Sequence, residues 1–457
     1  MGMSRDKENR LSFDALKQIM LDHGVEKLYY KILGTNNNNK QQIYLGGDLS
    51  AISIIPTGDF ESSDSVSEKK TLKKGKNKLT GAINLVWIDS EGRHSPAPHA
   101  KLILYPQYPE VRFSGFLRSS PDAPSDLLSY DKRGNEDGRV LFLGIRPDGK
   151  VFGYVSSPEA EVTREVRAKE DWDCKGVLCE VSITAQVTDA SSRKKMLLSE
   201  LLRIHEKGWI EGNKLNSDGV GNPYNAPNGG GYTLEAELGI KPNGYSEPDF
   251  LGWEVKQYRV KDFRRMNNGR VTLMTPEPDG GFYAGNDLMR FMEKYGYMTD
   301  DKYNFNGYHK FGERQEKTGL LLDIRGFDNE NNKITDADGS IILLDTAGEV
   351  AAEWSFAKLL DHWKRKHAEA VYVPARSKTE SHRQYYFGDM VKLGEGTNFE
   401  KFLSGMSERL VIYDPGSRIR HVHSKPEPKK RNQFRIAVKE LSGLYTSFCD
   451  ASLDNRD

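Results

Sequence analysis

The most informative residues of this chain are Pro248-Asp249-Phe250-Leu251-Gly252-Trp253-Glu254-Val255-Lys256. Proline disfavours a helix at the residue before it, and the residues from 250 to 260 alternate between apolar and polar side chains. We therefore predict a strand over residues 250–260 that turns polar at its far end. Because side chains on a strand repeat every two residues, Glu254 and Lys256 share one face, and Val255 points to the opposite face, into a core.

This spacing gathers two carboxylates and an ammonium group at one end of a strand. Asp249 enters from the preceding turn, so its oxygens and those of Glu254 can together hold a hard divalent cation such as Mg²⁺. A cation held there neutralises a phosphate and acidifies a bound water, and Lys256 can orient that water or stabilise the developing charge. A site of this kind is what a metal-dependent nuclease needs. A solvated strand edge uses the same residue types, and the spacing alone favours that alternative.

A glycine-rich turn precedes the predicted strand. It opens a short helix that ends in Leu-Gly-Ile over residues 229–240, and a loop containing Pro242-Asn243 follows. In order and spacing, these segments and the Asp-x4-Glu-x-Lys motif resemble the MvaI/BcnI family of type II restriction endonucleases. The resemblance begins near Leu201 and runs to about Tyr445, and it includes a basic segment at residues 431–435. It implies a mixed α/β PD-(D/E)XK nuclease domain with a MutH-like core.

The resemblance also implies roles for individual residues. Asp249 and Glu254 would bind the metal together with the backbone carbonyl of Val255, and Lys256 would be the catalytic lysine. Glu235, on the preceding helix, would reach the metal through water, and the alternative is an exposed helix carboxylate. Arg and Gln side chains form paired hydrogen bonds with guanine and adenine edges. The DNA contacts expected in the last third of the chain are Arg383, His421, His423, Arg431, Gln433 and Arg435.

Residues 1–188 have the pattern of a separate, mostly β module. Short apolar runs between turn residues predict strands over 43–45, 51–55, 81–88, 101–105, 140–145, 151–154 and 180–187. Residues 31–45 and 108–116 resemble the B3-like DNA-binding domains of some restriction enzymes, which are open β-barrels. The resemblance implies binding of a second DNA copy, with contacts from Lys40, Gln41, Gln42, Arg112, Ser114 and Arg118. The alternative is that these are ordinary surface residues of a β-barrel.

Residues 189–457 make up the predicted nuclease domain. A linking helix is expected over residues 191–207 because its apolar residues have helical spacing. Further strands are expected over 270–274, 318–324 and 341–344, and further helices over 286–295 and 348–368. Strands interleaved with helices are typical of a mixed α/β core. We therefore predict a multidomain protein with a β domain followed by an α/β nuclease domain.

Composition narrows the class of protein. The formal charge is zero, from 66 basic and 66 acidic residues, so DNA binding requires basic residues gathered in one cleft. Cys174, Cys179 and Cys449 are too few for a disulfide scaffold and lack the spacing of a zinc site, which favours the cytosol. No apolar stretch approaches the roughly 18 residues of a membrane span. We therefore expect no membrane partner.

These observations lead to one functional expectation and two alternatives. We expect a Mg²⁺-dependent type II restriction endonuclease that hydrolyses duplex DNA at a short GC-flanked site, by resemblance of the CCWGG or CCSGG type. The resemblance further implies a monomer, a cytoplasmic location in bacteria and a cognate methyltransferase. The alternatives are a MutH-like nickase of DNA repair and a DNA-binding effector with an inactive nuclease site.

Overall fold

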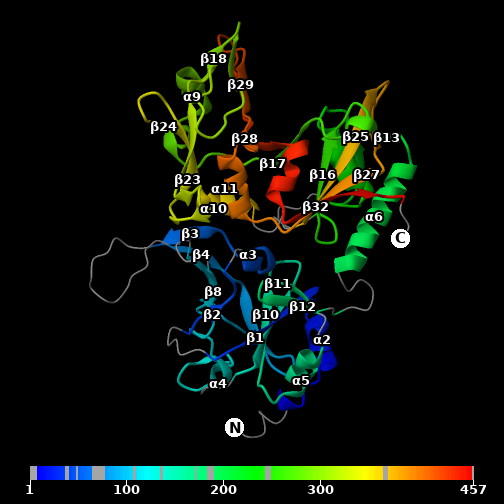
Figure 1. Ribbon diagram of the computed structural model, residues 1–457, viewed down its shortest axis with the longest axis vertical. Helices are drawn as coiled ribbons and strands as arrows, with labels where there is room; N and C mark the ends of the chain where they lie inside the picture. The colour runs from blue at the N-terminus through cyan, green and yellow to red at the C-terminus, as the bar shows by residue number, and fades with distance from the viewer. Residues whose placement is uncertain are drawn as a thin grey trace. The chain divides into compact units, whose positions relative to one another are not determined.

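The computed structural model describes residues 8–35, 41–47, 50–63, 78–105, 110–133, 137–169, 172–181, 183, 190–241, 249–363 and 369–454. The chain divides into two compact units, Met1–Arg193 and Lys194–Asp457. The sequence analysis places a boundary between residues 188 and 189. Figure 1 traces the chain through both units. Among the described helices, none combines the length and the apolar character needed to cross a membrane.

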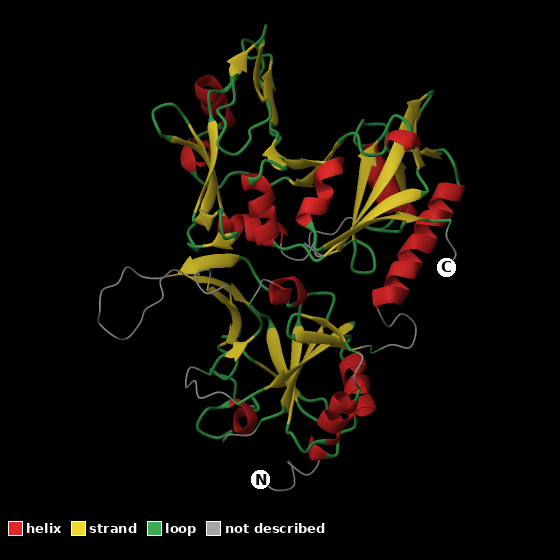
Figure 2. Ribbon diagram, viewed as in Figure 1, coloured by secondary structure: helices red, strands yellow, loops and turns green. Residues whose placement is uncertain are grey.

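The first unit is mostly β. Its strands are β1 (Lys27–Leu33), β2 (Ile43–Tyr44), β3 (Phe60–Ser63), β4 (Lys78–Ala82), β5 (Leu85–Ile88), β6 (His94–Pro96), β7 (Lys101–Tyr105), β8 (Glu110–Ser114), β9 (Arg139–Ile145), β10 (Val151–Ser156), β11 (Asp173–Lys175) and β12 (Leu178–Val181). Its described helices are α2 (Phe13–Asp22), α3 (Ser50–Ile54), α4 (Ser125–Leu128) and α5 (Glu161–Ala168). The strands form one sheet in the order β11-β12-β1-β9-β10-β5-β6 and a second in the order β2-β8-β7-β4-β3 (Figure 2).

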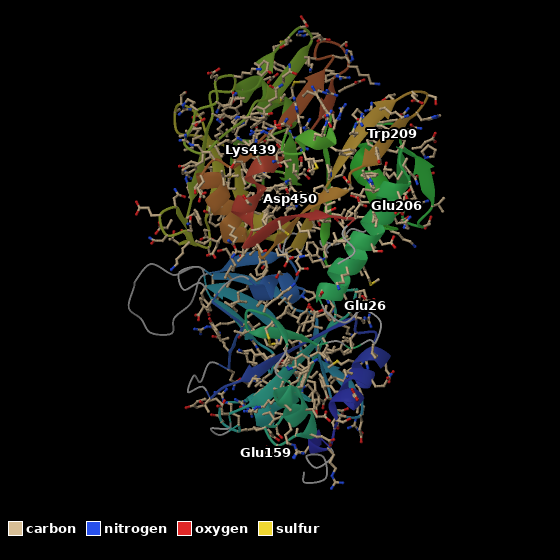
Figure 3. The ribbon with its side chains drawn as sticks, turned by 45° about the vertical axis from the view of Figure 1, so that its right-hand side comes forward. Glu26, Glu159, Glu206, Trp209, Lys439 and Asp450 are labelled. Carbon is tan, nitrogen blue, oxygen red and sulfur yellow. A yellow bond between two sulfur atoms is a disulfide. The ribbon has the colours of Figure 1, made fainter. Side chains whose placement is uncertain are left out.

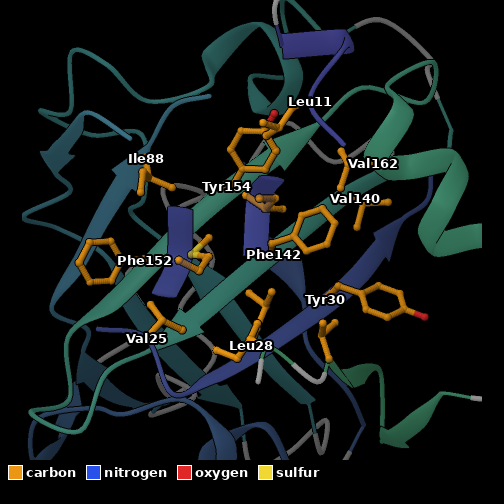
Figure 4. Packing of buried hydrophobic residues seen from close by; sticks show 14 of the residues in the cluster. Leu11, Val25, Leu28, Tyr30, Ile88, Val140, Phe142, Phe152, Tyr154 and Val162 are labelled. Carbon is orange, nitrogen blue, oxygen red and sulfur yellow. The ribbon is translucent and has the colours of Figure 1, made fainter. Parts of the chain in front are cut away.

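The core of the first unit lies between its larger sheet and its helices. All residues of β9 and β10 are buried, and Phe142 and Phe152 extend from these strands into the core (Figure 4). Leu16 of α2 and Val162 of α5 belong to the same apolar cluster. Burial of apolar surface contributes about 25 cal/mol per Å². The first unit therefore has a hydrophobic core of its own.

The first unit differs from the sequence-based expectations at four places. Residues 51–54 lie in helix α3 rather than in a strand, and Ile55 follows the helix, because an apolar run of this length has no periodicity that separates the two. The expected strand 81–88 is two strands, β4 and β5, which belong to different sheets. Strand β12 ends at Val181, and most of the remaining expected strand lies outside the described residues. Finally, Cys174 and Cys179, paired across β11 and β12, form a disulfide.

The second unit mixes helices and strands. Its helices are α6 (Ala190–Glu206), α7 (Gly229–Glu237), α8 (Gly281–Ala284), α9 (Leu288–Tyr295), α10 (Phe356–Trp363) and α11 (Phe399–Ser407), with 3-10 turns η1 (Phe263–Arg265) and η2 (Val438–Leu444). Its strands are β13 (Ile210–Glu211), β14 (Asn213–Leu215), β15 (Gly221–Pro223), β16 (Glu254–Arg259), β17 (Arg270–Met274), β18 (Tyr297–Met298), β19 (Lys302–Asn306), β20 (Leu321–Arg325), β21 (Phe327–Asp328), β22 (Lys333–Ile334), β23 (Ser340–Leu344), β24 (Val350–Ser355), β25 (Glu369–Thr379), β26 (Arg383–Phe387), β27 (Met390–Glu395), β28 (Val411–Tyr413), β29 (Gly416–Arg420), β30 (Glu427–Lys429), β31 (Phe434–Ala437) and β32 (Ser447–Ser452).

One six-stranded sheet is central to the site described below. Its strand order is β13-β26-β25-β27-β32, and β16 pairs with β25 in parallel. Helix α6 lies along this sheet (Figure 1), and its Leu197, Leu201 and Ile204 cluster with Val255 and Val371. Because neighbours along a strand alternate between faces, Glu254 and Lys256 lie on the face opposite to α6.

Most expected elements of the second unit are present, with one exception. The linking helix matches α6, and the strands at 270–274 and 341–344 match β17 and β23. Residues 348–368 were expected to be one helix, but strand β24 precedes α10 there. The reason is tertiary: β24 pairs with β23, with Ala352 opposite Leu343 and Trp354 opposite Ile341. The last residues of that expected helix, 364–368, lie outside the described residues.

The packing of α6 generates a test. Leu201 is 2% exposed in the core beneath the six-stranded sheet, so Leu201→Ala is expected to lower the free energy of unfolding by about 2–5 kcal/mol. Met196, on the same helix, is 42% exposed, and Met196→Ala serves as the control with little expected effect. Urea denaturation of the two variants measures both values. Equal stabilities would contradict the assigned packing of α6.

Candidate active site

A two-residue turn brings Asp249 back toward β16. The backbone N–H of Phe250 donates to Trp253 O at 3.0 Å, and that of Trp253 donates to Phe250 O at 2.8 Å. Between them, Leu251 has a φ of 50° and Gly252 a φ of 91°. Two central residues with positive φ are typical of the type I′ turn, which joins the arms of tight hairpins. The expected strand 250–260 therefore begins only at Glu254, and Asp249 and Glu254 flank the turn on its two arms.

The carboxylate of Asp249 is held against β16. Its Oδ2 accepts a hydrogen bond from the backbone N–H of Val255 at 2.9 Å. In an extended strand, the N–H and C=O groups of one residue point to the same side. The carbonyl of Val255 therefore points toward the edge of β16 where Asp249 lies. Two of the metal ligands that the sequence analysis predicts are thus directed to one edge of the strand.

Glu254 and Lys256 form an ion pair on the face opposite to α6. Lys256 Nζ donates to Glu254 Oε1 at 2.7 Å, and the two side chains are only 14% and 6% exposed. Burial of a carboxylate is unfavourable unless opposite charge and hydrogen bonds compensate for the lost water. The ammonium group of Lys256 supplies part of that compensation. A divalent cation would supply more, so this environment suits a metal-binding carboxylate.

Four residues from four strands form a row on the same face. The strand register aligns Lys256 of β16 with Tyr372 of β25, Lys392 of β27 and Asp450 of β32, which is labelled in Figure 3. Lys392 Nζ donates to Asp450 Oδ1 at 2.8 Å. The hydroxyl of Tyr372 lies 2.7 Å from that of Tyr445. Sequence analysis found Lys256 but missed Tyr372, Lys392, Tyr445 and Asp450, because these four are distant from the motif in the chain and belong to no local pattern.

The residues present fit a Mg²⁺ ion. Within the described ranges, no group of three or more His, Cys, Asp or Glu side chains could hold a metal, so Glu235 does not join Asp249 and Glu254 in such a group. The available oxygen donors are the carboxylates of Asp249 and Glu254 and the backbone carbonyl of Val255. Mg²⁺ retains several waters and is usually bound through one or two carboxylates together with substrate phosphates. This small set of hard oxygen donors matches that preference.

The DNA contacts predicted in the second unit lie in separate places. Arg383 begins β26, and its backbone N–H donates to Asn225 Oδ1 at 2.9 Å. His421 and His423 lie together beyond the end of β29, next to Asp301. His421 Nδ1 is 4.0 Å from Asp301 Oδ2, and the backbone N–H of His423 donates to Asp301 Oδ1 at 3.0 Å. Both histidines are exposed, so their rings are accessible to a ligand.

Arg431, Gln433 and Arg435 differ in their surroundings. Arg431 is exposed, and its Nε and Nη2 donate to Gln433 Oε1 at 2.9 and 2.6 Å. Arg435 forms an ion pair with Asp414 at 2.5 Å, with side chains 22% and 12% exposed, and also donates to Arg270 O. The charge of Arg435 is therefore balanced inside the protein. Arg431 is the better placed of the two to reach DNA.

In the first unit, strand pairing joins the two segments that resemble B3-like domains. Tyr44 of β2 is opposite Arg112 of β8. Arg112 donates to Gln42 Oε1 at 2.9 Å and to Glu110 Oε1 at 2.6 Å. Gln41 precedes β2 with a φ of 50°. Ser114 ends β8, Arg118 follows it in a turn, and Lys40 lies outside the described residues.

A cavity of about 250 Å³ adjoins these residues in the first unit. Gln41, Gln42 and Tyr44 line one part of it, together with the end of β1. Its charged lining residues are Lys31, Arg133 and Arg139. Burial lowers the pKa of Lys31, and Arg139 donates to the carbonyls of Leu127 and Gly34. Among the residues that the structure describes, the charged groups that line this cavity are thus cationic.

Comparison with known proteins places the chain among DNA-cleaving restriction enzymes. The model of the MvaI/BcnI restriction endonuclease family matches residues 198–445, which is more than half of the chain. The chain belongs to this family, and it is accordingly an enzyme, a type II site-specific deoxyribonuclease. Restriction endonucleases typically use divalent metal ions.

Two solved structures are similar to the chain. The complex of restriction endonuclease MvaI with cognate DNA substrate is 18% identical, with a TM-score of 0.42, and the match covers 56% of this chain and 96% of that one. MvaI in the absence of DNA is 16% identical, with a TM-score of 0.32, and the match covers 57% and 98% of the two chains. No curated protein matches the sequence.

The hairpin turn generates a second test. A Cβ at Gly252 would meet no atom within 4 Å, so Gly252→Ala changes only the preference of the backbone. Because its φ of 91° is unfavourable for alanine, the substitution is expected to cost about 1–2 kcal/mol of unfolding free energy. It is also expected to raise the metal concentration needed for half-maximal cleavage, since the turn positions Asp249.

Gly231 provides the matched control for this test. A Cβ there also meets no atom within 4 Å, but the residue lies in helix α7, where alanine is preferred by about 0.5–1 kcal/mol. Urea denaturation measures the unfolding free energy of both variants, and Gly231→Ala is expected to stabilise the protein. If Gly252→Ala proved neutral or stabilising, Gly252 would not have the positive φ on which the turn depends.

Proposed function

We propose that the chain hydrolyses phosphodiester bonds of duplex DNA with Mg²⁺, and that Asp249, Glu254 and the Val255 carbonyl hold the ion. The observation that carries this proposal is the hairpin, which directs Asp249 to the edge of β16 beside the Glu254–Lys256 pair. When bound, Mg²⁺ supplies charge neutralisation at the phosphate and lowers the pKa of a water molecule. Lys256 orients a water molecule and stabilises the negative charge that develops at phosphorus.

In this proposal, Asp249, Lys256 and Glu235 have distinct tasks. The hydrogen bond from Val255 fixes the orientation of the Asp249 carboxylate. Lys256 has three N–H donors, of which one is directed to Glu254, so others can reach water and a phosphate oxygen. Its positive charge in a half-buried position stabilises negative charge more strongly than it would in bulk water. Glu235 remains a proposed contact through water only.

We propose a short GC-flanked target of the CCWGG or CCSGG type. Support comes from Arg431, an exposed guanidinium whose plane is fixed by two hydrogen bonds to Gln433. A planar guanidinium suits the O6 and N7 acceptors of guanine in the major groove. His421, His423 and Arg383 are the other proposed contacts. The ion pair of Arg435 with Asp414 favours a structural role for Arg435 instead.

We further propose that the first unit binds a second DNA copy. Gln41 and Gln42 line a cavity, and Arg112 donates a hydrogen bond to Gln42. The charged lining residues that the structure describes are cations, which favours a phosphate group as the ligand. Ser114 and Arg118 follow Arg112 along the chain and are proposed as further contacts. The B3-like barrel, a monomeric state, a cytoplasmic location and a cognate methyltransferase belong to the same proposal and rest on the family resemblance.

Digestion of a fully sequenced plasmid tests the proposed function. With Mg²⁺, and with EDTA as the control, the account predicts discrete double-strand ends at one short motif, located by sequencing. Nicks in one strand alone would support the MutH-like alternative. DNA binding without any cleavage would support the effector alternative, and either result would overturn the proposal.

The role of Lys256 has its own prediction. Lys256→Ala is expected to reduce single-turnover cleavage by about 10²-fold or more, since the charge at phosphorus loses its stabilising ammonium group. The affinity for DNA is expected to stay within a factor of about two, measured by fluorescence anisotropy without metal. The exposed Lys261 supplies the control, and Lys261→Ala should retain full cleavage. Cleavage by Lys256→Ala at the wild-type rate would remove Lys256 from the mechanism.

Loss of the Arg431 side chain is predicted to weaken DNA binding, whereas loss of the Arg435 side chain is predicted to lower stability. Arg431→Ala is expected to weaken cognate DNA binding by about 1–3 kcal/mol and leave the melting temperature unchanged. Arg435→Ala is expected to cost about 1–3 kcal/mol of stability, because Asp414 loses its ion-pair partner. Anisotropy titrations and thermal melts separate the two effects. Weaker binding by Arg435→Ala with unchanged stability would reverse the assignment.

A further inference from the structure

Asn432 is buried between two residues whose side chains reach the surface. It lies in the segment 430–433, which joins β30 to β31, and it is only 3% exposed. Arg431 is exposed and Gln433 is partly exposed. Burial of an amide is unfavourable unless its hydrogen bonds are made inside the protein. The interior around Asn432 must therefore supply partners for its side chain.

The backbone on both sides of Asn432 is held in an extended conformation. The N–H of Gly416 donates to Arg431 O at 2.9 Å, and the N–H of Asp414 donates to Gln433 O at 2.8 Å. These bonds continue the antiparallel pairing of β29 with β30 and of β28 with β31. Because neighbours along an extended chain point to opposite sides, anchoring Asn432 inside directs Arg431 and Gln433 outward.

The side chain of Asn432 belongs to a chain of hydrogen bonds. Tyr413 O–H donates to Asn432 Oδ1 at 2.5 Å, and Asn432 Nδ2 donates to the hydroxyl oxygen of Tyr283 at 3.3 Å. Tyr283 O–H in turn donates to Glu277 Oε2 at 2.5 Å. We call these four residues the Asn432 network. Tyr413 comes from β28 and Tyr283 from α8, so the network ties the segment 430–433 to two other elements.

The carboxylate at the end of the network fixes the direction of every bond. An ionised carboxylate only accepts hydrogen bonds, so the single O–H of Tyr283 is directed to Glu277. The oxygen of Tyr283 then accepts from the NH₂ group of Asn432. The amide oxygen of Asn432 consequently faces Tyr413, whose O–H donates to it. The Asn432 amide therefore has one orientation, in which both of its ends are hydrogen-bonded.

On the outer side, Arg431 and Gln433 form one unit. Arg431 Nε and Nη2 both donate to Gln433 Oε1, which occupies the two lone pairs of that oxygen. The NH₂ group of Gln433 and the remaining N–H groups of Arg431 are all donors. This edge fits guanine, whose N7 and O6 are both acceptors, better than adenine, which presents one acceptor and one donor.

We propose that Asn432 is a positioning residue for DNA recognition, and that its network holds Arg431 and Gln433 as one rigid unit that reads a guanine. The inference rests on the proposed function, in which Arg431 contacts a GC-flanked site. Side chains that are ordered before binding lose less conformational entropy when the complex forms. Asn432 touches no base in this account and acts only through its neighbours.

Replacement of guanine by 7-deazaguanine, which lacks the N7 acceptor, provides the test. The probe is a duplex that carries the motif found by plasmid digestion, with either base in that motif. Fluorescence anisotropy without metal measures the affinity of the full chain for both duplexes. The wild-type chain is expected to bind the guanine duplex about 5-fold or more tightly than the modified one. We call this quotient the N7 ratio.

Two variants weaken the network without removing a ring. Tyr283→Phe and Tyr413→Phe each delete one hydroxyl, so either variant suffices if the other fails to fold. Both are expected to lower the N7 ratio to about 2 or less, because the guanidinium is no longer held in one place. Their affinity for a duplex without the motif is expected to stay within a factor of about two, since contacts with phosphates do not depend on N7.

Tyr295→Phe is the matched control in the same unit. Tyr295 is 5% exposed, and its hydroxyl donates to Asp345 Oδ2 at 3.3 Å, outside the Asn432 network. The substitution also removes one hydroxyl from a buried ring and keeps the ring itself. It is expected to share any loss of stability and to keep the wild-type N7 ratio. An equal fall of the ratio in Tyr295→Phe would assign the effect to general loss of stability and overturn the inference.

Arg431→Ala separates failure of the inference from failure of the proposed function. If Arg431→Ala lowers the N7 ratio while both network variants keep it, the positioning role is wrong and the guanine contact stands. If Arg431→Ala keeps the wild-type ratio, or if the wild-type ratio is close to 1, Arg431 does not read N7 and both proposals fail. A fall in Arg431→Ala and in the network variants, but not in Tyr295→Phe, supports the inference.

Discussion

The candidate site depends on one tight turn, in which Leu251 and Gly252 both have positive φ. The turn reverses the chain within two residues, and the N–H of Val255 then holds Asp249 at 2.9 Å. A left-handed conformation costs a residue such as leucine about 1–2 kcal/mol. Such strain persists where the surrounding structure enforces it, often at functional sites. Here the enforced geometry explains the spacing of the motif: four residues between Asp249 and Glu254 are those of the turn and its closing pair.

The two faces of the six-stranded sheet have different roles: one forms a hydrophobic core, and the other carries the candidate catalytic residues. Beneath α6, apolar side chains such as Val255 and Val371 form a core. The opposite face carries Glu254 and Lys256, each only slightly exposed. Tyr372 lies on the same face in the next strand, and its hydroxyl is within hydrogen-bond distance of that of Tyr445. Charges kept this far from water are stable only when partners compensate for the lost hydration. The site therefore combines mutually compensating groups on the sheet with Asp249, which the tight turn holds at the edge of β16.

Local motifs in the sequence predicted the candidate ligands, but they did not predict the surroundings. Asp249, Glu254 and Lys256 were found because they are close in the chain, and α6 because its apolar residues have helical spacing. Residues 348–355 were misassigned because pairing with β23 overrides local preference. The positions of Tyr372 and the ion pair of Arg435 could not be predicted, since both depend on strand register between distant segments.

The most direct test of the metal site is anomalous diffraction from a crystal of the full chain soaked with Mn²⁺. The account predicts an anomalous peak about 2.1 Å from a carboxylate oxygen of Asp249, from one of Glu254 and from the carbonyl oxygen of Val255. A fully occupied Mn²⁺ site elsewhere on the second unit, with no peak between Asp249 and Glu254, would contradict the account.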